Sequence, residues 1–245
     1  MKRVLVVGGA NGVGLAISSV LAQDSETEKV YIVDKQGVSA EYMQPKFQCF
    51  QFDLTNTDYS FFDQFCDIDG LVITAGFGRL SLFKDIEEQH IMNSFNVNTI
   101  PVLRLVKRFY SKLESSTPFY CGVMVSIAGF MTSPFFSVYG ATKAALKIFI
   151  ESVNVELEKS GTQNRILNVS PGSIKGTSFN NGKTDLTVVH DLATEIVSRI
   201  KAHDDLFIPL YDEVFKGVLE RYHNDFRAEG LHSYDYKVSS GRVKI

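Results

Sequence analysis

The sequence lacks most features of a membrane, secreted or metal-dependent protein. Its three cysteines, Cys49, Cys66 and Cys121, are far apart and in no C-x-x-C arrangement, which predicts buried free thiols in a reducing compartment and argues against disulfides and zinc. No apolar run reaches the roughly eighteen residues of a membrane span, and the run from Val4 to Val7 is too short for the core of a signal peptide. We therefore expect a cytoplasmic protein without membrane contact, and the dispersed histidines predict no metal site.

Positive charge is not concentrated anywhere along the chain. The sequence has 25 lysines and arginines against 28 aspartates and glutamates, which gives a formal net charge of −3, and the basic residues are scattered. Nucleic-acid-binding proteins gather basic residues into a patch or a stripe. We expect no nucleic-acid partner, whereas a small molecule that carries phosphate is compatible with this charge.

Internal repeats, low-complexity stretches and linkers rich in proline and serine are also absent. The chain has 245 residues, of which 44% are hydrophobic, so it can bury a large core, and α/β chains of this size routinely form one domain. We expect residues 1–245 to be a single domain.

What the sequence contains is an alternation of short β-branched runs and amphipathic stretches. Strands are predicted at 3–8, 29–34, 47–53, 70–76, 120–129, 165–172 and 206–209. Amphipathic stretches or helices are predicted at 13–23, 59–65, 87–114, 137–160, 191–202 and 211–229. Because parallel strands need crossover connections, this order predicts an α/β fold with a doubly wound parallel sheet and helices on both faces.

The pattern weakens toward the C-terminus. Residues 176–185, GTSFNNGKTD, have the composition of a loop. The predicted helix at 211–229 sets Phe215, Leu219, Tyr222 and Phe226 on one side, a stripe that suits a core, a subunit interface or a cap over a cleft. The tail from residue 231 has no assignable pattern, so residues 211–245 are expected to form a C-terminal helix and tail.

A glycine-rich turn follows the first predicted strand. Gly8, Gly12 and Gly14 in VGGANGVG would let the backbone approach a pyrophosphate, and the following helix supplies N–H donors and partial positive charge. Twenty residues beyond Gly14, Asp34 ends the second strand, where a carboxylate accepts hydrogen bonds from ribose hydroxyls and repels a 2′-phosphate. This pattern favours NAD, but Lys35 could partly compensate a phosphate charge, so NADP stays open.

A tyrosine and a lysine lie one helical turn apart in SVYGATKAAL. Tyr139 and Lys143 can be explained by ordinary packing, since lysine stems and half-buried tyrosines both cover apolar surface. The alternative is a proton-transfer pair, because a nearby ammonium favours the phenolate electrostatically. The pair alone does not decide between them.

These motifs together resemble the short-chain dehydrogenase/reductase family over about residues 2–210. The family's T-G-x-x-x-G-x-G signature matches Val7 to Gly14, with valine in place of threonine, and its N-N-A-G segment matches Ile73 to Gly76, without the asparagines. The resemblance implies a Rossmann-type fold and an NAD(P)-dependent oxidoreductase that transfers a hydride between a nicotinamide and a secondary alcohol or ketone. The replaced side chains at Val7, Ile73 and Thr74 predict missing hydrogen bonds at the carboxyl edge of the sheet.

The resemblance also implies roles for individual residues. Tyr139 would be the acid/base, Ser126 would orient the substrate oxygen, and Asn98 would hold a water. Lys143 would bind the nicotinamide ribose and bring the pKa of Tyr139 toward neutrality. The implied cofactor contacts are Gly8, Asn11, Gly12, Val13, Gly14, Asp34, Lys35, Asp53, Leu54, Thr74, Ala75, Gly76, Asn98, Tyr139, Lys143, Pro171, Gly172, Ile174 and Thr177.

Substrate and partners are less defined. Residues 176–190 are expected to cover a small alcohol or carbonyl substrate, and their polar composition suggests a sugar or polyol. By analogy with the family we expect a homodimer or homotetramer built on the two long helices. The alternative function is a dinucleotide-sensing regulator or scaffold without catalysis, which would need the glycine turn but not Tyr139.

Overall fold

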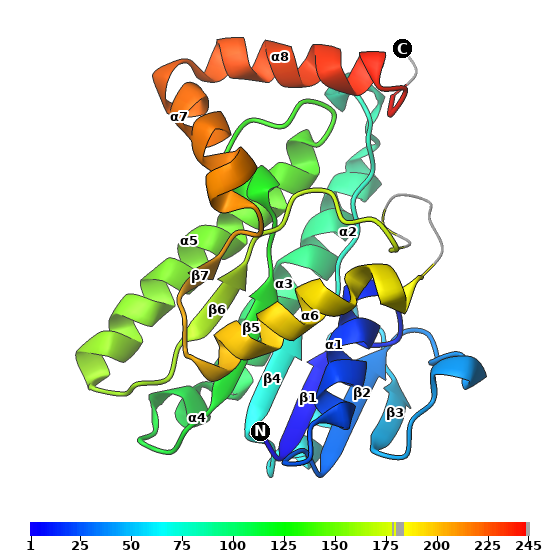
Figure 1. Ribbon diagram of the computed structural model, residues 1–245, viewed down its shortest axis with the longest axis vertical. Helices are drawn as coiled ribbons and strands as arrows, with labels where there is room; N and C mark the ends of the chain where they lie inside the picture. Colours follow the sequence, from blue (N-terminus) through cyan, green and yellow to red (C-terminus); the bar gives the residue numbers. More distant parts are fainter. Residues whose placement is uncertain (178, 180–183, 244–245) are drawn as a thin grey trace.

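Seven parallel strands form one sheet in a computed structural model that describes residues 1–177, 179 and 184–243 (Figure 1). The strands are β1 (Arg3–Val7), β2 (Lys29–Asp34), β3 (Phe47–Gln51), β4 (Gly70–Ile73), β5 (Tyr120–Met124), β6 (Ile166–Val169) and β7 (Leu206–Phe207). Their order across the sheet is β3-β2-β1-β4-β5-β6-β7. The predicted parallel sheet is confirmed.

Two hydrophobic cores cover the two faces of the sheet. Alternate residues of β1 point to opposite faces, so Leu5 and Val7 join one cluster, whereas Val4 and Val6 join the other. The helices α3 (Ile100–Arg108), α4 (Tyr110–Glu114) and α5 (Ser137–Ser160) contribute to the first cluster. The second contains residues of α1 (Gly12–Gln23) and α6 (Leu186–Lys201). The predicted helices on both faces are confirmed.

The order of the strands places a crevice at the carboxyl end of β1. From β1 the chain continues outward to β2 and β3, and then returns to β4 on the other side of β1. Connections on the two sides of such a strand run over opposite faces of the sheet, which leaves a crevice where ligands bind in open α/β sheets. The glycine turn lies at this point.

The predicted helix at 87–114 is divided into three. The chain forms α2 (Glu88–Asn98), then α3 and α4, with breaks at Thr99 and Phe109. Pro101 lies in the first turn of α3, where it has no N–H to continue the hydrogen bonds of α2. The amphipathic stretch at 59–65 is also short, a 3-10 helix over Ser60–Phe65.

The C-terminal prediction of one helix at 211–229 is wrong. A π-helical turn (Tyr211–Phe215) leads into α7 (Lys216–Asn224), and α8 (Phe226–Ser239) follows after a break. The break occurs because the Asp225 carboxylate caps α8, accepting hydrogen bonds at 3.0 Å from the backbone of Arg227 and Ala228. Phe226 therefore leaves the predicted stripe and is exposed. Figure 1 shows α7 and α8 beyond the carboxyl ends of the strands.

Two smaller sequence predictions also change. Cys121 is buried, but Cys49 and Cys66 are exposed, so the prediction of three buried thiols is wrong for two of them. The helix predicted at 191–202 begins earlier, at Leu186, because Asp185 accepts a 3.0 Å hydrogen bond from the Thr187 backbone. Within the described residues no helix is long and apolar enough to cross a membrane.

Candidate active site

A cavity of about 1150 Å³ opens at the carboxyl end of the sheet. Its walls contain all the predicted site residues except Asn98: Gly8, Asn11, Gly12, Val13, Gly14, Asp34, Lys35, Asp53, Leu54, Thr74, Ala75, Gly76, Ser126, Tyr139, Lys143, Pro171, Gly172, Ile174 and Thr177. The fold thus brings together residues that are distributed along most of the chain.

The glycine turn is shaped by close backbone approaches. Gly8 and Gly12 have φ angles of +87° and +51°, which non-glycine residues rarely adopt. A Cβ atom on Gly14 would lie 2.2 Å from the Gly8 carbonyl oxygen and 2.4 Å from the Thr74 hydroxyl. The Thr74 hydroxyl itself donates to the Gly8 and Val7 carbonyls at 2.9 and 3.3 Å, so the prediction of a missing brace is wrong at Thr74.

Asp34 is tied to the glycine turn. One carboxylate oxygen accepts a 3.1 Å hydrogen bond from the backbone of Ala10, and the other accepts from the backbone of Gln36 at 3.2 Å. The Asn11 amide donates to the Gln36 side chain at 3.2 Å. These bonds hold the end of β2 against the start of α1, at the place where the sequence predicts a ribose contact.

Asp53 lies beyond the neighbouring strand β3. It accepts hydrogen bonds from the backbone and the hydroxyl of Thr55, at 2.8 and 2.7 Å. These bonds lower the pKa of Asp53 below its usual value. Its carboxylate is therefore a fixed negative charge at the cavity wall.

Ser126 and Tyr139 meet where β5 ends and α5 begins. The Ser126 hydroxyl accepts a 3.2 Å hydrogen bond from the backbone of Ala128 and lies 3.5 Å from the Pro171 carbonyl oxygen. Burial raises the pKa of Tyr139 to about 12, and its hydrogen bond with Ser126 opposes this shift. At neutral pH the phenol therefore keeps its proton.

Lys143 is buried one turn further along α5. Only 2% of the residue is exposed, and its ammonium donates a 2.9 Å hydrogen bond to the Met124 carbonyl at the end of β5. Its Nζ lies 5.7 Å from the centre of the Tyr139 ring. Burial lowers the pKa of Lys143 to about 8. The prediction that Lys143 brings the pKa of Tyr139 toward neutrality is wrong, because burial raises the pKa of Tyr139 and lowers that of Lys143.

Asn98 lies behind the cavity wall rather than in it. The residue is completely buried, and its side chain accepts from the Phe77 backbone at 2.9 Å and donates to the Phe77 carbonyl and the Thr142 hydroxyl at 2.8 and 3.2 Å. A Cβ atom on Gly76 would lie 3.3 Å from the Asn98 oxygen. Asn98 therefore holds the loop after β4 against α5.

The segment after β6 returns to the glycine turn. The Thr177 hydroxyl donates to the Ile174 carbonyl at 3.3 Å, and the Thr177 side chain packs against Gly12. The backbone of Gly12 donates a 3.3 Å hydrogen bond to the Thr184 hydroxyl. Of the predicted substrate segment at 176–190, residues 178 and 180–183 lie outside the described residues, and among the others only Thr177 and Phe179 border the cavity.

The sequence predicted only Phe179, in the substrate segment, and Phe215, in the stripe suited to a cap, at the end of the cavity farthest from β1. Apolar side chains of the loops and of the π-helical turn line it: Phe77, Leu80, Met131, Phe136, Phe179, Val214 and Phe215. Charged side chains of α7, α8 and the tail complete it: Arg221, Glu229, His232, Lys237 and Arg242. These residues belong to no motif, and the N-cap residue Asp225 is the local signal that could have placed α8.

Known proteins share both the sequence pattern and the fold. A sequence model of the short chain dehydrogenase family matches residues 2–186. The uncharacterized oxidoreductase TDA5 of Saccharomyces cerevisiae is 29% identical over 199 residues, which cover 72% of this chain and 56% of the yeast protein. Sorbitol-6-phosphate 2-dehydrogenase of Klebsiella pneumoniae is 28% identical over 194 residues, or 72% of this chain and 70% of that protein.

A solved structure agrees along most of the chain. A short-chain dehydrogenase from Sphingobium yanoikuyae, in complex with NADPH, has a TM-score of 0.73 at 20% identity and covers 93% of this chain and 96% of its own. At this identity the likeness shows the fold alone. Because the family match extends from the glycine turn through the tyrosine and lysine pair, this chain belongs to the short-chain dehydrogenase family of oxidoreductases.

Proposed function

We propose that this protein is an NAD(P)-dependent oxidoreductase that transfers a hydride between a nicotinamide cofactor and a secondary alcohol or ketone. The observation that carries the proposal is that Ser126, Tyr139 and Lys143 border the same cavity as the glycine turn. One cavity would therefore hold both the dinucleotide and the group that transfers a proton. Hydride transfer with protonation of an oxygen requires this arrangement.

In the proposed reaction Tyr139 exchanges a proton with the substrate oxygen. Because burial raises its pKa to about 12, the phenol is protonated at neutral pH and suited to donate during reduction of a carbonyl. Ser126, held by the Ala128 backbone, would hydrogen-bond the same oxygen and fix its orientation. Lys143 adds a cationic donor near the phenol when protonated, and Asn98 positions the adjoining loop.

The residues of the glycine turn fit a dinucleotide. Gly8 and Gly12 have positive φ angles, and Gly8 and Gly14 lie too close to other backbone for a side chain, as the tight turn of a pyrophosphate site requires. The N-terminus of α1 favours phosphate. A bound nicotinamide dinucleotide would supply or accept the hydride. Asp34 and Lys35 would face its adenosine ribose, and the negative charge of Asp34 favours NAD, with NADP as the alternative.

The substrate is proposed to be a small molecule with a secondary alcohol or a ketone. The Klebsiella relative is named for a phosphorylated sugar alcohol, which agrees with chemistry at a CH–OH group and with the polar, sugar-like or polyol-like substrate suggested by the composition of residues 176–190. The cavity also has apolar walls, including Phe136 and Phe179, which would cover an apolar part of such a molecule.

Replacement of Tyr139 by phenylalanine tests the chemistry. We expect Tyr139→Phe to lower kcat by about 10²- to 10⁴-fold, measured from NADH or NADPH absorbance with a panel of ketones and alcohols, while NADH binding measured by fluorescence is retained. Tyr110→Phe, on α4 outside the cavity, is the matched control. Unchanged turnover in Tyr139→Phe would refute the mechanism. Nucleotide binding by a wild-type protein inactive on the whole panel would favour the dinucleotide sensor.

The assembly is proposed to be one domain per chain in a homodimer or homotetramer. On α5, Ile148 and Val155 lie two turns apart and are 58% and 69% exposed, an apolar pair suited to a subunit contact. We expect Ile148→Glu combined with Val155→Glu to reduce the mass measured by light scattering, whereas Met43→Glu, which changes an exposed residue outside this helix, leaves it unchanged. A monomeric wild type would refute the proposal.

A further inference from the structure

A second buried lysine lies at the opposite end of the cavity from the glycine turn. Lys237 of α8 is only 7% exposed, and its ammonium donates to the Ser133 hydroxyl at 3.0 Å and to the Pro134 carbonyl at 2.9 Å. An ammonium has three donors, and these two bonds use two of them. Both acceptors are neutral, although buried charges are ordinarily paired.

The charged groups around Lys237 carry a net positive charge. Among the described residues, no carboxylate lies within ion-pair distance of Lys237. Arg242, a second cation that also borders the cavity, acts on Lys237 electrostatically. Glu229 borders the cavity as well, but its carboxylate is engaged by the Arg221 guanidinium at 2.7 Å, with His232 at 3.8 Å. The excess of positive charge is thus at Lys237 and Arg242.

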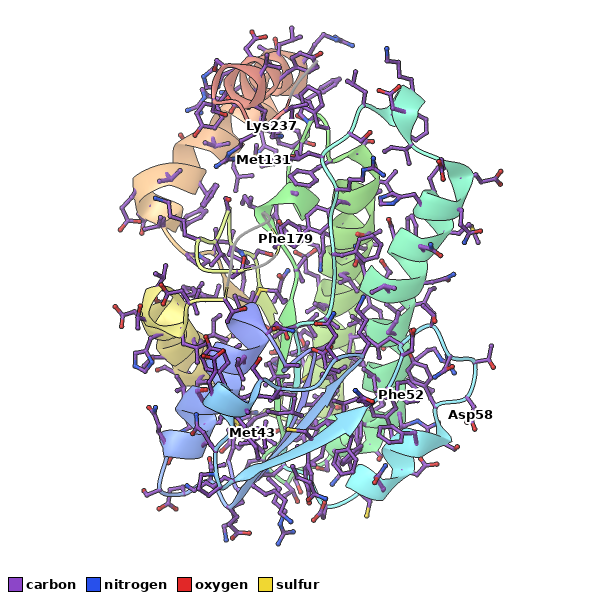
Figure 2. The ribbon with its side chains drawn as sticks, turned by 90° about the vertical axis from the view of Figure 1, so that its right-hand side faces the viewer. Met43, Phe52, Asp58, Met131, Phe179 and Lys237 are labelled. Atoms are coloured by element: carbon purple, nitrogen blue, oxygen red, sulfur yellow. The ribbon has the colours of Figure 1, made fainter. Side chains whose placement is uncertain are left out.

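Lys237 and Tyr139 both lie close to the Phe136 ring, in a part of the cavity with apolar walls. The Lys237 ammonium lies 5.7 Å from the centre of the Phe136 ring, which in turn lies 5.2 Å from the Tyr139 ring. Phe179 approaches Tyr139 to 5.3 Å, and Met131 also borders this region. Figure 2 shows Lys237 beneath α8, with Met131 and then Phe179 nearer to the sheet.

We propose that Lys237, assisted by Arg242, binds an anionic group of the substrate, a carboxylate, at the far end of the cavity. This inference rests on the proposed function, because it places the reacting oxygen of the substrate at Tyr139. The molecule would carry its ketone or secondary alcohol at Tyr139, an apolar middle about one ring long against Phe136 and Phe179, and its carboxylate at Lys237.

A matched pair of ketones tests this arrangement. In 4-acetylbenzoate one benzene ring separates a ketone from a carboxylate, and 4-acetylbenzamide has nearly the same shape without the charge. We expect kcat/KM of the wild-type protein to be at least about tenfold higher for the benzoate, and this preference to decline with added salt. Equal values for the two compounds, or a preference for the amide, would overturn the proposal and leave the proposed oxidoreductase activity intact.

Variants of Lys237 assign the preference to this residue. Lys237→Gln removes the charge and should bring the ratio of the two kcat/KM values close to one by lowering only the value for the benzoate, whereas Lys237→Arg should retain the preference. Lys216→Gln, an exposed lysine of α7 outside the cavity, is the matched control. If Lys237→Gln keeps the full preference, the lysine is merely an anchor of α8. If the variant does not fold, the comparison of the two compounds with the wild type still decides.

Binding separates failure of this proposal from failure of the proposed function. Calorimetric titration of the wild-type protein in the presence of NADH should show tighter binding of the benzoate than of the amide, whether or not either ketone is reduced. Tyr139→Phe should lose turnover but retain this difference. Tight binding of the benzoate without turnover would refute the catalytic proposal alone, and absence of binding by both compounds, or equal binding, would refute the anion site.

Discussion

The two ends of the cavity each contain a buried lysine, but the sequence predicts a role for only one of them. Lys143 belongs to a Y-x-x-x-K motif on α5 and donates to the Met124 carbonyl. Lys237 belongs to a helix that the sequence did not predict, and it donates to Ser133 and Pro134. Burial lowers the pKa of both to about 8. A buried lysine with a lowered pKa therefore occurs once within a motif and once without one.

The difference lies in what positions each lysine. Lys143 lies in a motif of one short stretch of α5, so the sequence identifies it, and its hydrogen bond to Met124 joins residues only 19 apart. Lys237 depends on the packing of α8 against a loop more than 90 residues earlier, through the Phe135 and Tyr234 rings at 4.6 Å and a 3.3 Å hydrogen bond from the Thr132 hydroxyl to the Phe226 carbonyl. Contacts between distant segments leave no local pattern.

The largest effect is expected where backbone geometry leaves no room. Because a Cβ atom on Gly14 would lie 2.2 Å from the Gly8 oxygen, Gly14→Ala should lower the free energy of unfolding by about 2 to 3 kcal/mol and weaken NADH binding at least about tenfold. Thermal and chemical denaturation measure the first, fluorescence titration the second. In Gly37→Ala, where nothing lies within 4 Å of the added atom, both should be nearly unchanged. Equal tolerance at Gly14 and Gly37 would contradict the close backbone approach at the glycine turn.

A pH series tests whether the two lysines are equivalent. Below pH 8 the folded and unfolded states both carry the proton, so the folded state bears the cost of a buried ammonium. As the pH rises from about 8 toward 10, the folded protein loses these protons first, and the free energy of unfolding should rise by about 1 to 2 kcal/mol for each of Lys143 and Lys237. Urea denaturation at each pH up to 10 measures it. The buried Cys121 thiol and Tyr139, whose pKa values are both raised to about 12, act in the opposite direction from about pH 9 and pH 10.

Methionine substitutions separate the two contributions to this rise. Lys143→Met and Lys237→Met should each remove about half of the rise in the free energy of unfolding between pH 8 and 10. Lys84→Met, at an exposed position, should leave this rise unchanged. If Lys143→Met alone abolishes the rise, the ammonium of Lys237 is less buried than that of Lys143, and the two lysines are not equivalent.

The sequence predicted most of the cofactor end because its requirements are local and chemical. A glycine with a positive φ, such as Gly8, and a tyrosine four residues before a lysine are visible in one short stretch. It did not predict that Asn98 would lie behind the wall, since whether a side chain faces a cavity or a neighbouring helix depends on the packing of α2 against α5. Nor did it predict the direction of the pKa of Tyr139, because burial is a property of the assembled fold.

The smallest predicted effect concerns Asp34, because the sequence leaves the preference between NAD and NADP open. We expect the wild type to bind NADH more tightly than NADPH, and Asp34→Asn to reduce the ratio of the two dissociation constants about tenfold by removing repulsion of a 2′-phosphate. The substitution keeps an oxygen that can accept from the Ala10 backbone but loses the acceptor for the Gln36 backbone. Because this loss should weaken binding of NADH and NADPH alike, a change in the ratio reports the charge. Asp58→Asn, outside the cavity, is the control. Tighter binding of NADPH by the wild type would refute the assignment of Asp34, and the cofactor end would then share with the substrate end a specificity that the sequence does not reveal.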